Sequence, residues 1–264
     1  MLPHKERLRL IKFVCEYENP AGGFNFPRET PASIAETYNG VMLFNELGFD
    51  CGNPLTKEYI RNLELKADMS LEHLYRLAKV SETLSMPDRM SEIRESVLGR
   101  KCRKGSKLTD AYYSVLLEEV LDIDGVLRQD MLEYVLKSKV KKLRFMSECQ
   151  KYLAVKTHLG LEVETEEAVS WVQATQSYDG GFGFLPGSTS FLENVYSALD
   201  SLQMLNSVPL DTQGCEDFVL ACRSKEGAFG RQLMALPSLE HSLLAVRSLK
   251  IINAMRIGAH SDRD

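Results

Sequence analysis

The stretch Trp171-Val-Gln-Ala-Thr-Gln-Ser-Tyr-Asp-Gly-Gly-Phe182 is followed by Tyr196, fourteen residues after its final Phe. Near the N-terminus the same pattern runs through Gly22-Gly23-Phe24 to Tyr38, again fourteen residues further on. A third copy, with Gly227-Ala228-Phe229, lies near the C-terminus. A pattern that returns at a fixed spacing predicts a repeat architecture before any single residue is interpreted.

Each copy predicts two helices joined by a glycine turn and a polar loop. The first helix is short and amphipathic, and glycine ends it because a sharp reversal favours a positive φ. The second helix is more apolar and begins after a Ser or Thr, so Ser33, Thr189 and Ser238 are predicted N-caps. A carboxylate in the first turn of that helix is favoured by the helix dipole.

The middle of the chain lacks the glycine turn but keeps the second helix. First helices are predicted near 5–17, 55–65, 88–98, 127–138, 165–176 and 213–223, and second helices start near 32, 70, 109, 146, 190 and 238. A single hairpin of this kind cannot bury its apolar face alone, whereas stacked hairpins can, and a closed ring removes exposed ends. We therefore expect an all-α fold, an α6/α6 toroid with the second helices inside. An open α-solenoid is the alternative.

Composition narrows the class of protein. The 264 residues carry the repeat from end to end, so we expect one domain over 1–257 and a C-terminal tail over 258–264. A net charge of −5 argues against nonspecific nucleic-acid binding. No stretch is long enough to span a bilayer, and no signal-peptide pattern is present. Six cysteines without a CxxC pair indicate reduced thiols and a cytoplasmic location.

The repeat resembles that of the β subunits of protein prenyltransferases and of class II terpene cyclases, the prenyltransferase and squalene-cyclase family. Gly180-Gly181-Phe182 and the helix that contains Tyr196-Ser-Ala-Leu199 match the signature best. The match is specific in the first, fifth and sixth copies and only structural in the other three. The resemblance implies an α/α barrel with a funnel-shaped apolar cavity. It does not by itself imply a reaction.

In such a ring the second helices point the same way, so the starts of these helices meet at one mouth. Carboxylates, histidines and phenols over an apolar pocket are typical of a small-ligand site. The alternative is ordinary helix-dipole acids and core tyrosines. The residues predicted to line the cavity are Glu36, Tyr38, Glu72, His73, Tyr75, Asp110, Tyr113, Tyr196 and Glu240.

The resemblance also implies a test for zinc. Protein prenyltransferases hold zinc with an Asp-x-Cys on one inner helix and a His on the next, and the matching positions here are Glu193, Val195 and His241. Valine cannot replace a thiolate, and Cys149, one helix away, is the remaining weak candidate. We therefore expect no zinc or magnesium cofactor. Glu193 and His241 are the candidate catalytic pair, as acid and base or as a degenerate metal site.

Class II cyclases protonate an alkene with an Asp-x-Asp-Asp acid, and the nearest string in this chain is Asp122-Ile123-Asp124-Gly125. Its final Asp is missing, and it falls at the end of a second helix. We interpret it as a helix terminus, with Gly125 as the breaker.

Two basic runs, 99–107 and 137–144, occupy the turns between the first and second helices of the third and fourth hairpins. Cations beside helix N-termini suit a diphosphate. The alternatives are a solvated turn or, less favoured, an acidic protein partner or nucleic acid. The predicted diphosphate-binding residues are Arg100, Lys101, Arg103, Lys104, Lys139 and Lys142.

These features leave three functions open. The first is an isoprenoid-diphosphate-handling protein, similar to a prenyltransferase or to a small terpene cyclase, with the polyprenyl tail or another apolar molecule in the cavity. The second is a non-catalytic binding or scaffold protein that kept the ring and lost the zinc and acid chemistry. The third is a β-like subunit that needs a helical-repeat partner.

Overall fold

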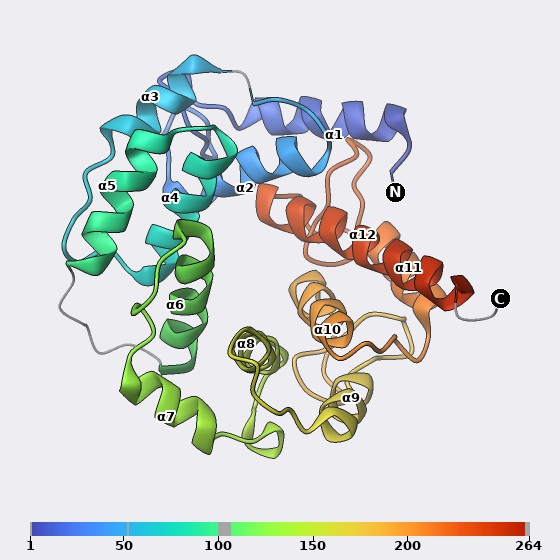
Figure 1. Ribbon diagram of the computed structural model, residues 1–264. Coiled ribbons are helices and arrows are strands. Elements are labelled where there is room, and N and C mark those ends of the chain that lie inside the picture. The colour runs from blue at the N-terminus through green and yellow to red at the C-terminus, as the bar shows by residue number, and fades with distance from the viewer. Residues whose placement is uncertain (1, 52, 100–106, 262–264) are drawn as a thin grey trace. The chain divides into compact units, whose positions relative to one another are not determined.

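The computed structural model describes residues 2–51, 53–99 and 107–261, and within these the regular elements are twelve α-helices and one 3₁₀ turn, η1 (Val140–Lys142) (Figure 1). They form the six predicted pairs. The first members are α1 (His4–Glu16), α3 (Pro54–Asn62), α5 (Pro87–Leu98), α7 (Gln129–Lys137), α9 (Thr165–Gln173) and α11 (Thr212–Ala221). The second members are α2 (Ile34–Glu46), α4 (Leu71–Thr83), α6 (Lys107–Leu121), α8 (Met146–His158), α10 (Leu192–Met204) and α12 (Leu239–Ser261).

The chain divides into two compact units. Unit 2 is the continuous segment Ile11–Leu136, and unit 1 combines Met1–Leu10 with Lys137–Asp264. Helix α1 therefore starts in unit 1 and ends in unit 2. The division into one domain over 1–257 and a tail over 258–264 stays a prediction.

The second helix of each pair forms the core of its unit. In unit 2, α4 packs between α2 and α6, and in unit 1, α10 packs between α8 and α12. Helix α10 buries five of its apolar residues, whereas α3 and α11 each bury only a narrow stripe, such as Cys215 and Val219 of α11. A helix that packs between neighbours buries more of its surface than a helix that packs on one face, which buries only a stripe.

The glycine turn has the same structure in all three copies that carry it. An isolated antiparallel bridge closes each turn, and the Phe at its end is fully buried. The first glycine has a φ of +95° at Gly22 and +82° at Gly180. A Cβ atom there would lie 2.1 Å from the carbonyl oxygen of Leu55 or Gly214, at the start of the next first helix. Glycine is thus required both by conformation and by close backbone approach.

The turn of the sixth copy lies against the beginning of the chain. A Cβ atom on Gly227 would lie 3.1 Å from the Cβ of Arg9 in α1. The guanidinium of Arg223 also pairs with Glu6 at 2.6 Å. Within unit 1, the glycine turn of the sixth copy therefore packs against the start of α1. In the same way, the turn of the first copy packs against α3 and the turn of the fifth copy packs against α11.

Hydroxyl groups cap several second helices. Ser33 Oγ accepts from the backbone N–H of Glu36 at 3.1 Å, and Ser238 Oγ accepts from that of His241 at 3.1 Å, which confirms both predicted caps. The prediction for Thr189 is wrong, because α10 begins two residues later, after Phe191. Ser190 donates its hydroxyl to Asp179 and so belongs to the loop.

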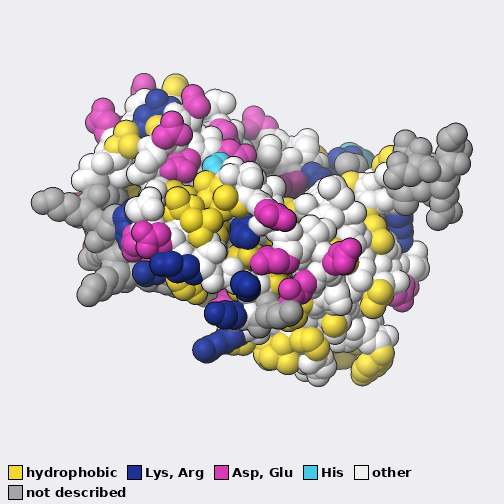
Figure 2. All heavy atoms as spheres, turned by 60° about the horizontal axis from the view of Figure 1, so that its bottom comes forward, with side chains coloured by type: hydrophobic (Ala, Val, Ile, Leu, Met, Phe, Trp, Pro, Cys, Tyr) yellow, Lys and Arg dark blue, Asp and Glu magenta, His cyan; other side chains and the backbone are white. Residues whose placement is uncertain are grey.

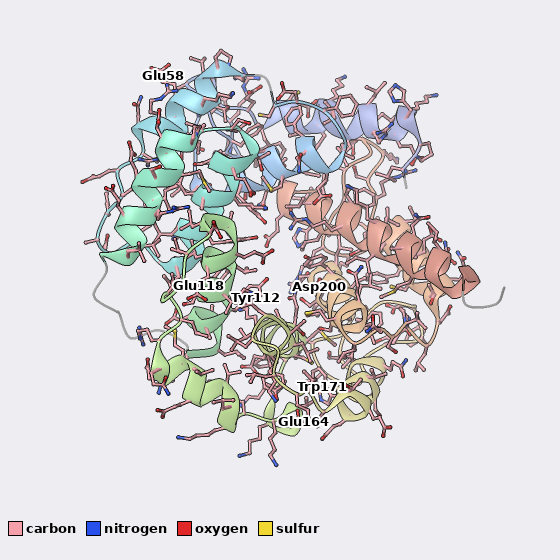
Figure 3. The ribbon with its side chains drawn as sticks, viewed as in Figure 1. Glu58, Tyr112, Glu118, Glu164, Trp171 and Asp200 are labelled. Carbon is pink, nitrogen blue, oxygen red and sulfur yellow. The ribbon has the colours of Figure 1, made fainter. Side chains whose placement is uncertain are left out.

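Helix α6 ends at Leu121, and Asp122 takes the positive φ of +51° that ends it. The Asp122–Asp124 string therefore follows the helix, as the sequence predicts, although Gly125 is not the first residue to leave the helical conformation. Glu118, labelled in Figure 3, accepts from the backbone N–H groups of Val126 and Leu127 at 2.7 and 2.9 Å. One carboxylate thereby holds the loop that leads to α7.

Candidate functional site

Three predicted tyrosines form a row in unit 2. Tyr38, Tyr75 and Tyr113 come from the starts of α2, α4 and α6, which are neighbours in the core. The ring centroids are 6.3 Å apart between Tyr38 and Tyr75 and 5.9 Å apart between Tyr75 and Tyr113. Tyr112, which projects from α6 in Figure 3, meets Tyr113 edge-on at 5.1 Å. We call Tyr38, Tyr75 and Tyr113 the tyrosine row.

A charged pair lies on the tyrosine row. Arg76 donates to Glu72 at 2.6 Å, and its guanidinium carbon lies 5.8 Å from the centre of the Tyr38 ring. Tyr113 also forms a hydrogen bond with Glu72; burial, and then the Glu72 charge, raise the pKa of Tyr113 far above its ordinary value. The phenol of Tyr113 therefore stays neutral and donates. Sequence reasoning missed Arg76, although its i,i+4 spacing from Glu72 is a known pairing signal.

The other predicted cavity residues of unit 2 have different surroundings. His73 is exposed, and its Nδ1 lies 2.9 Å from the hydroxyl of its own cap, Ser70. Burial raises the pKa of Asp110, and its charged neighbours are Arg128 and Asp130 at the start of α7. Glu36 lies in the first turn of α2, beside the helix start that Ser33 caps. His73 and Asp110 thus interact with residues outside the tyrosine row.

The predicted catalytic pair meets in unit 1, together with an arginine. Glu193 Oε2 lies 3.7 Å from His241 Nε2, while Nδ1 of His241 lies 2.8 Å from the hydroxyl of Ser238. Arg231 Nε donates to Glu193 Oε1 at 2.6 Å, Nη2 of the same guanidinium lies 2.5 Å from that oxygen, and the guanidinium stacks on Phe191 at 3.8 Å. Burial lowers the pKa of His241, an effect that Arg231 reinforces and that Glu240 and Glu193 oppose. At neutral pH the imidazole is therefore uncharged.

These residues do not fit a protein-held zinc ion. Val195 is fully buried and supplies no donor atom, and the guanidinium of Arg231 occupies Glu193 Oε1. Oε2 of Glu193 is buried without a hydrogen-bond partner, but with His241 Nε2 it offers only two donors. Cys149 is fully buried, and burial raises the pKa of its thiol to about 12. Among residues 2–51, 53–99 and 107–261, no group of three or more His, Cys, Asp or Glu side chains is placed to hold a metal.

Tyr196 and Glu240 also belong to unit 1. Tyr196 is half-buried on α10, and Glu240 is exposed in the first turn of α12. Their place at a cavity stays a prediction.

A buried polar network, which no motif in the sequence indicates, links α8 to α10. Gln150 donates to Asp200 at 2.7 Å and accepts from Ser197 at 2.9 Å. Burial raises the pKa of Asp200, against the opposing effects of Gln150 and Arg247. Figure 3 shows Asp200 on α10, and also Glu164 and Trp171 at the neighbouring α9. The hydrogen bonds explain why these polar side chains are tolerated between packed helices.

The basic runs are described only in part. Arg100, Lys101, Arg103 and Lys104 lie outside the described residues. Lys139 and Lys142 are exposed in the α7–α8 connection, at η1, as the sequence predicts for that turn. On the face shown in Figure 2, Lys and Arg side chains lie beside Asp and Glu side chains and beside apolar patches. Diphosphate binding by these residues stays a prediction.

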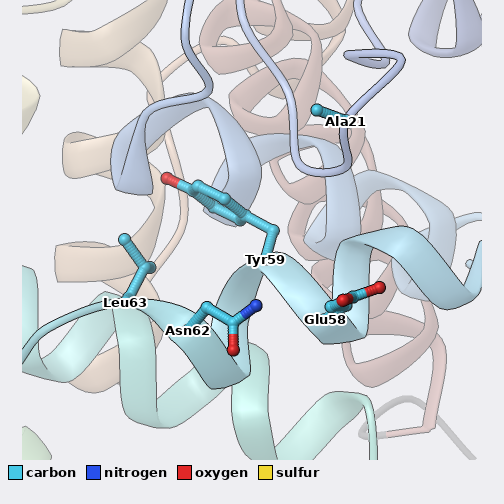
Figure 4. A pocket seen from close by; sticks show the side chains of 5 residues that line it. All are labelled: Ala21, Glu58, Tyr59, Asn62 and Leu63. Carbon is cyan, nitrogen blue, oxygen red and sulfur yellow. The ribbon is translucent and has the colours of Figure 1, made fainter.

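A pocket of about 390 Å³ lies in unit 2, between the turn after α1 and helix α3 (Figure 4). Its lining residues are Ala21, Glu58, Tyr59, Asn62 and Leu63. Tyr59 already donates its hydroxyl to the carbonyl of Ala32 at 3.0 Å. The remaining polar groups are one exposed carboxylate and one amide, to which we assign no ligand.

In the part of the chain that the structure describes, no helix has the length and apolar character needed to cross a membrane.

Comparison with known proteins places the chain in a family. No curated protein matches the chain. A family model described as the prenyltransferase α/α toroid domain matches residues 1–139 and again 99–211, as expected of a sequence built from repeats. The protein is therefore an all-α member of the prenyltransferase α/α toroid domain family.

Proposed function

We propose that the protein binds an isoprenoid diphosphate, with the polyprenyl tail packed against the tyrosine row. The observation that supports this most directly is the contact of three rings from three neighbouring core helices, at 6.3 and 5.9 Å. Burial of an apolar chain contributes about 0.8 kcal/mol per CH₂ group. A row of this kind therefore favours a long apolar chain over a small polar ligand.

The diphosphate needs cations beyond the tyrosine row. Arg76 lies at the row, but Glu72 already pairs with it. We therefore propose that Lys139 and Lys142, with Arg100, Lys101, Arg103 and Lys104, supply the diphosphate contacts. Arginine and lysine differ in this role, since arginine binds phosphate oxygens in pairs and lysine acts as a point charge.

A second candidate is a non-catalytic binding protein. Val195 and the Arg231–Glu193 pair stand where the resemblance puts the zinc of protein prenyltransferases. We therefore derive no transfer step through zinc. An acid–base role for Glu193 and His241, which face each other at 3.7 Å, stays part of the first candidate. A helical-repeat partner subunit and a cytoplasmic location also stay proposals.

Calorimetric titration with farnesyl and geranylgeranyl diphosphate tests the proposal, with inorganic diphosphate and the free alcohols as comparators. Both prenyl diphosphates should bind, and Tyr75→Ala should weaken them at least tenfold. The matched control is Tyr178→Ala, because Tyr178 is fully exposed. No heat and no thermal shift with either ligand, or equal affinity of Tyr75→Ala and wild type, would refute binding at the row. A ligand that binds but is neither hydrolysed nor transferred would favour the non-catalytic candidate.

A further inference from the structure

Three loops of unit 1 form a continuous edge. They are the parts nearest the second helix in the connections between the first and second helices of the fourth, fifth and sixth pairs, and they span 139–145, 183–191 and 230–238. The backbone N–H of Met146 donates to the carbonyl of Phe184 at 2.9 Å, and the Phe145 and Phe184 rings lie 5.9 Å apart. The backbone N–H of Leu192 donates to the carbonyl of Arg231 at 2.9 Å, which joins the third loop. We call these three segments the loop edge.

The loop edge exposes large apolar side chains. Leu233, Met234 and Leu236 are 64%, 95% and 90% exposed, and all three lie within four residues of one loop. The other exposed apolar residues of the loop edge are Phe145, Phe184 and Leu185. Single exposed apolar residues are ordinary, but a cluster of them indicates an interaction surface. The backbone at Met234 also has a φ of +62°, which few side chains other than Asn and Asp adopt readily.

The charges of the loop edge have one sign. Its three loops contain five Lys or Arg residues and no Asp or Glu, although the whole chain carries a net charge of −5. Two of the nearest carboxylates have partners in the loops, since Glu148 accepts from the backbone N–H of Arg144 and Glu193 pairs with Arg231. Asp179 and Glu240 are exposed acids beside the loop edge, and Asp179 accepts from the hydroxyl of Ser190 at 2.8 Å. The surface thus combines apolar tips with a cationic border.

We propose that the loop edge docks on the surface of a phospholipid bilayer that carries anionic headgroups. Apolar side chains on separate loop tips can enter the acyl boundary, while lysine and arginine stay at the headgroup level. Each cation near an anionic leaflet strengthens attraction, and this attraction is screened by salt. A protein partner would instead favour a fitted apolar core with a mixed polar rim. The proposal does not rest on the proposed ligand of the tyrosine row.

Vesicle flotation tests the proposal with the full chain. Binding to vesicles of phosphatidylcholine and phosphatidylserine should exceed binding to pure phosphatidylcholine at least tenfold, and should fall as salt rises. The variant Leu233→Ser, Met234→Asn, Leu236→Ser should lose at least tenfold of this binding, and Asn suits the φ at the middle position. Its matched control is Val208→Ser, Leu210→Ser, two exposed residues in the loop that joins α10 to α11. Lys142→Glu, Arg144→Glu should abolish the preference for phosphatidylserine.

Several outcomes would overturn the proposal. The first is that the wild type binds neither kind of vesicle. The second is that the triple variant and its control lose vesicle binding equally. The third is that vesicle binding depends neither on salt nor on phosphatidylserine. Self-association that the triple variant removes, without vesicle binding, would assign the loop edge to a second copy of the chain instead. Circular dichroism and thermal unfolding of each variant show that the fold is kept, so that a loss of binding reports on the surface.

Discussion

Replacing Gly180 with alanine tests how the glycine turn is held against the neighbouring helix. Alanine at a φ of +82° costs about 1–2 kcal/mol, because its Cβ approaches the following carbonyl. The new Cβ would also lie 2.1 Å from the carbonyl oxygen of Gly214, a backbone atom of α11 that cannot rotate away. Overpacking of this kind costs a further ~1–3 kcal/mol. The expected loss of unfolding free energy is therefore about 2–5 kcal/mol.

Gly187→Ala is the matched control. Gly187 has nearly the same φ, +78°, but no atom beyond its chain neighbours lies within 4 Å of its added Cβ. It should lose only about 1–2 kcal/mol. The entropy that alanine removes from the unfolded chain is the same in both variants, so it cancels in the comparison.

Urea unfolding, followed by circular dichroism at several protein concentrations, measures the difference. Gly180→Ala should unfold at clearly lower urea than Gly187→Ala with a similar slope, because the surface exposed on unfolding is unchanged. If the two variants agree within about 0.5 kcal/mol, the approach of the turn to α11 does not constrain the fold, and the reasoning fails.

Three further predictions follow from single contacts. Because burial lowers the pKa of His241 in the folded protein, the stability that this residue gives above its unfolded pKa of about 6.5 should be lost as the pH falls below that value. Arg231→Gln should raise the folded-state pKa of His241 and so reduce this loss. NMR titration of the imidazole and urea unfolding at several pH values would measure both effects. Glu118→Ala should lower the free energy of unfolding in urea by about 1.5–3 kcal/mol, because two part-buried hydrogen bonds from backbone N–H groups to the carboxylate are lost. Glu119→Ala, at an exposed site, should change it little. Ser33→Ala should cost about 1 kcal/mol and lower the melting temperature, and no change there would mean that the cap contributes nothing.

The sequence predicts the helix pairs well because their signals are local. Apolar periodicity, the glycine turn and the capping serines each act within a few residues, and the structure has a helix at every predicted place. Thr189 fails as a cap because α10 begins only after Phe191, and Ser190 bonds to Asp179 instead, a contact that depends on how the loop folds back. Arg231 reaches Glu193 across 38 residues, so no local pattern could reveal that it fills the position beside His241.

Unit 1 is built from two segments that all of unit 2 separates in the chain. The segment Ile11–Leu136 is continuous and can therefore fold as soon as it leaves the ribosome, since the contacts within it are available by then. Residues 2–10, by contrast, precede that segment, but Glu6 can pair with Arg223 only after Arg223 has been synthesised. A segment that is synthesised before unit 2 thus finds a partner that is synthesised after unit 2.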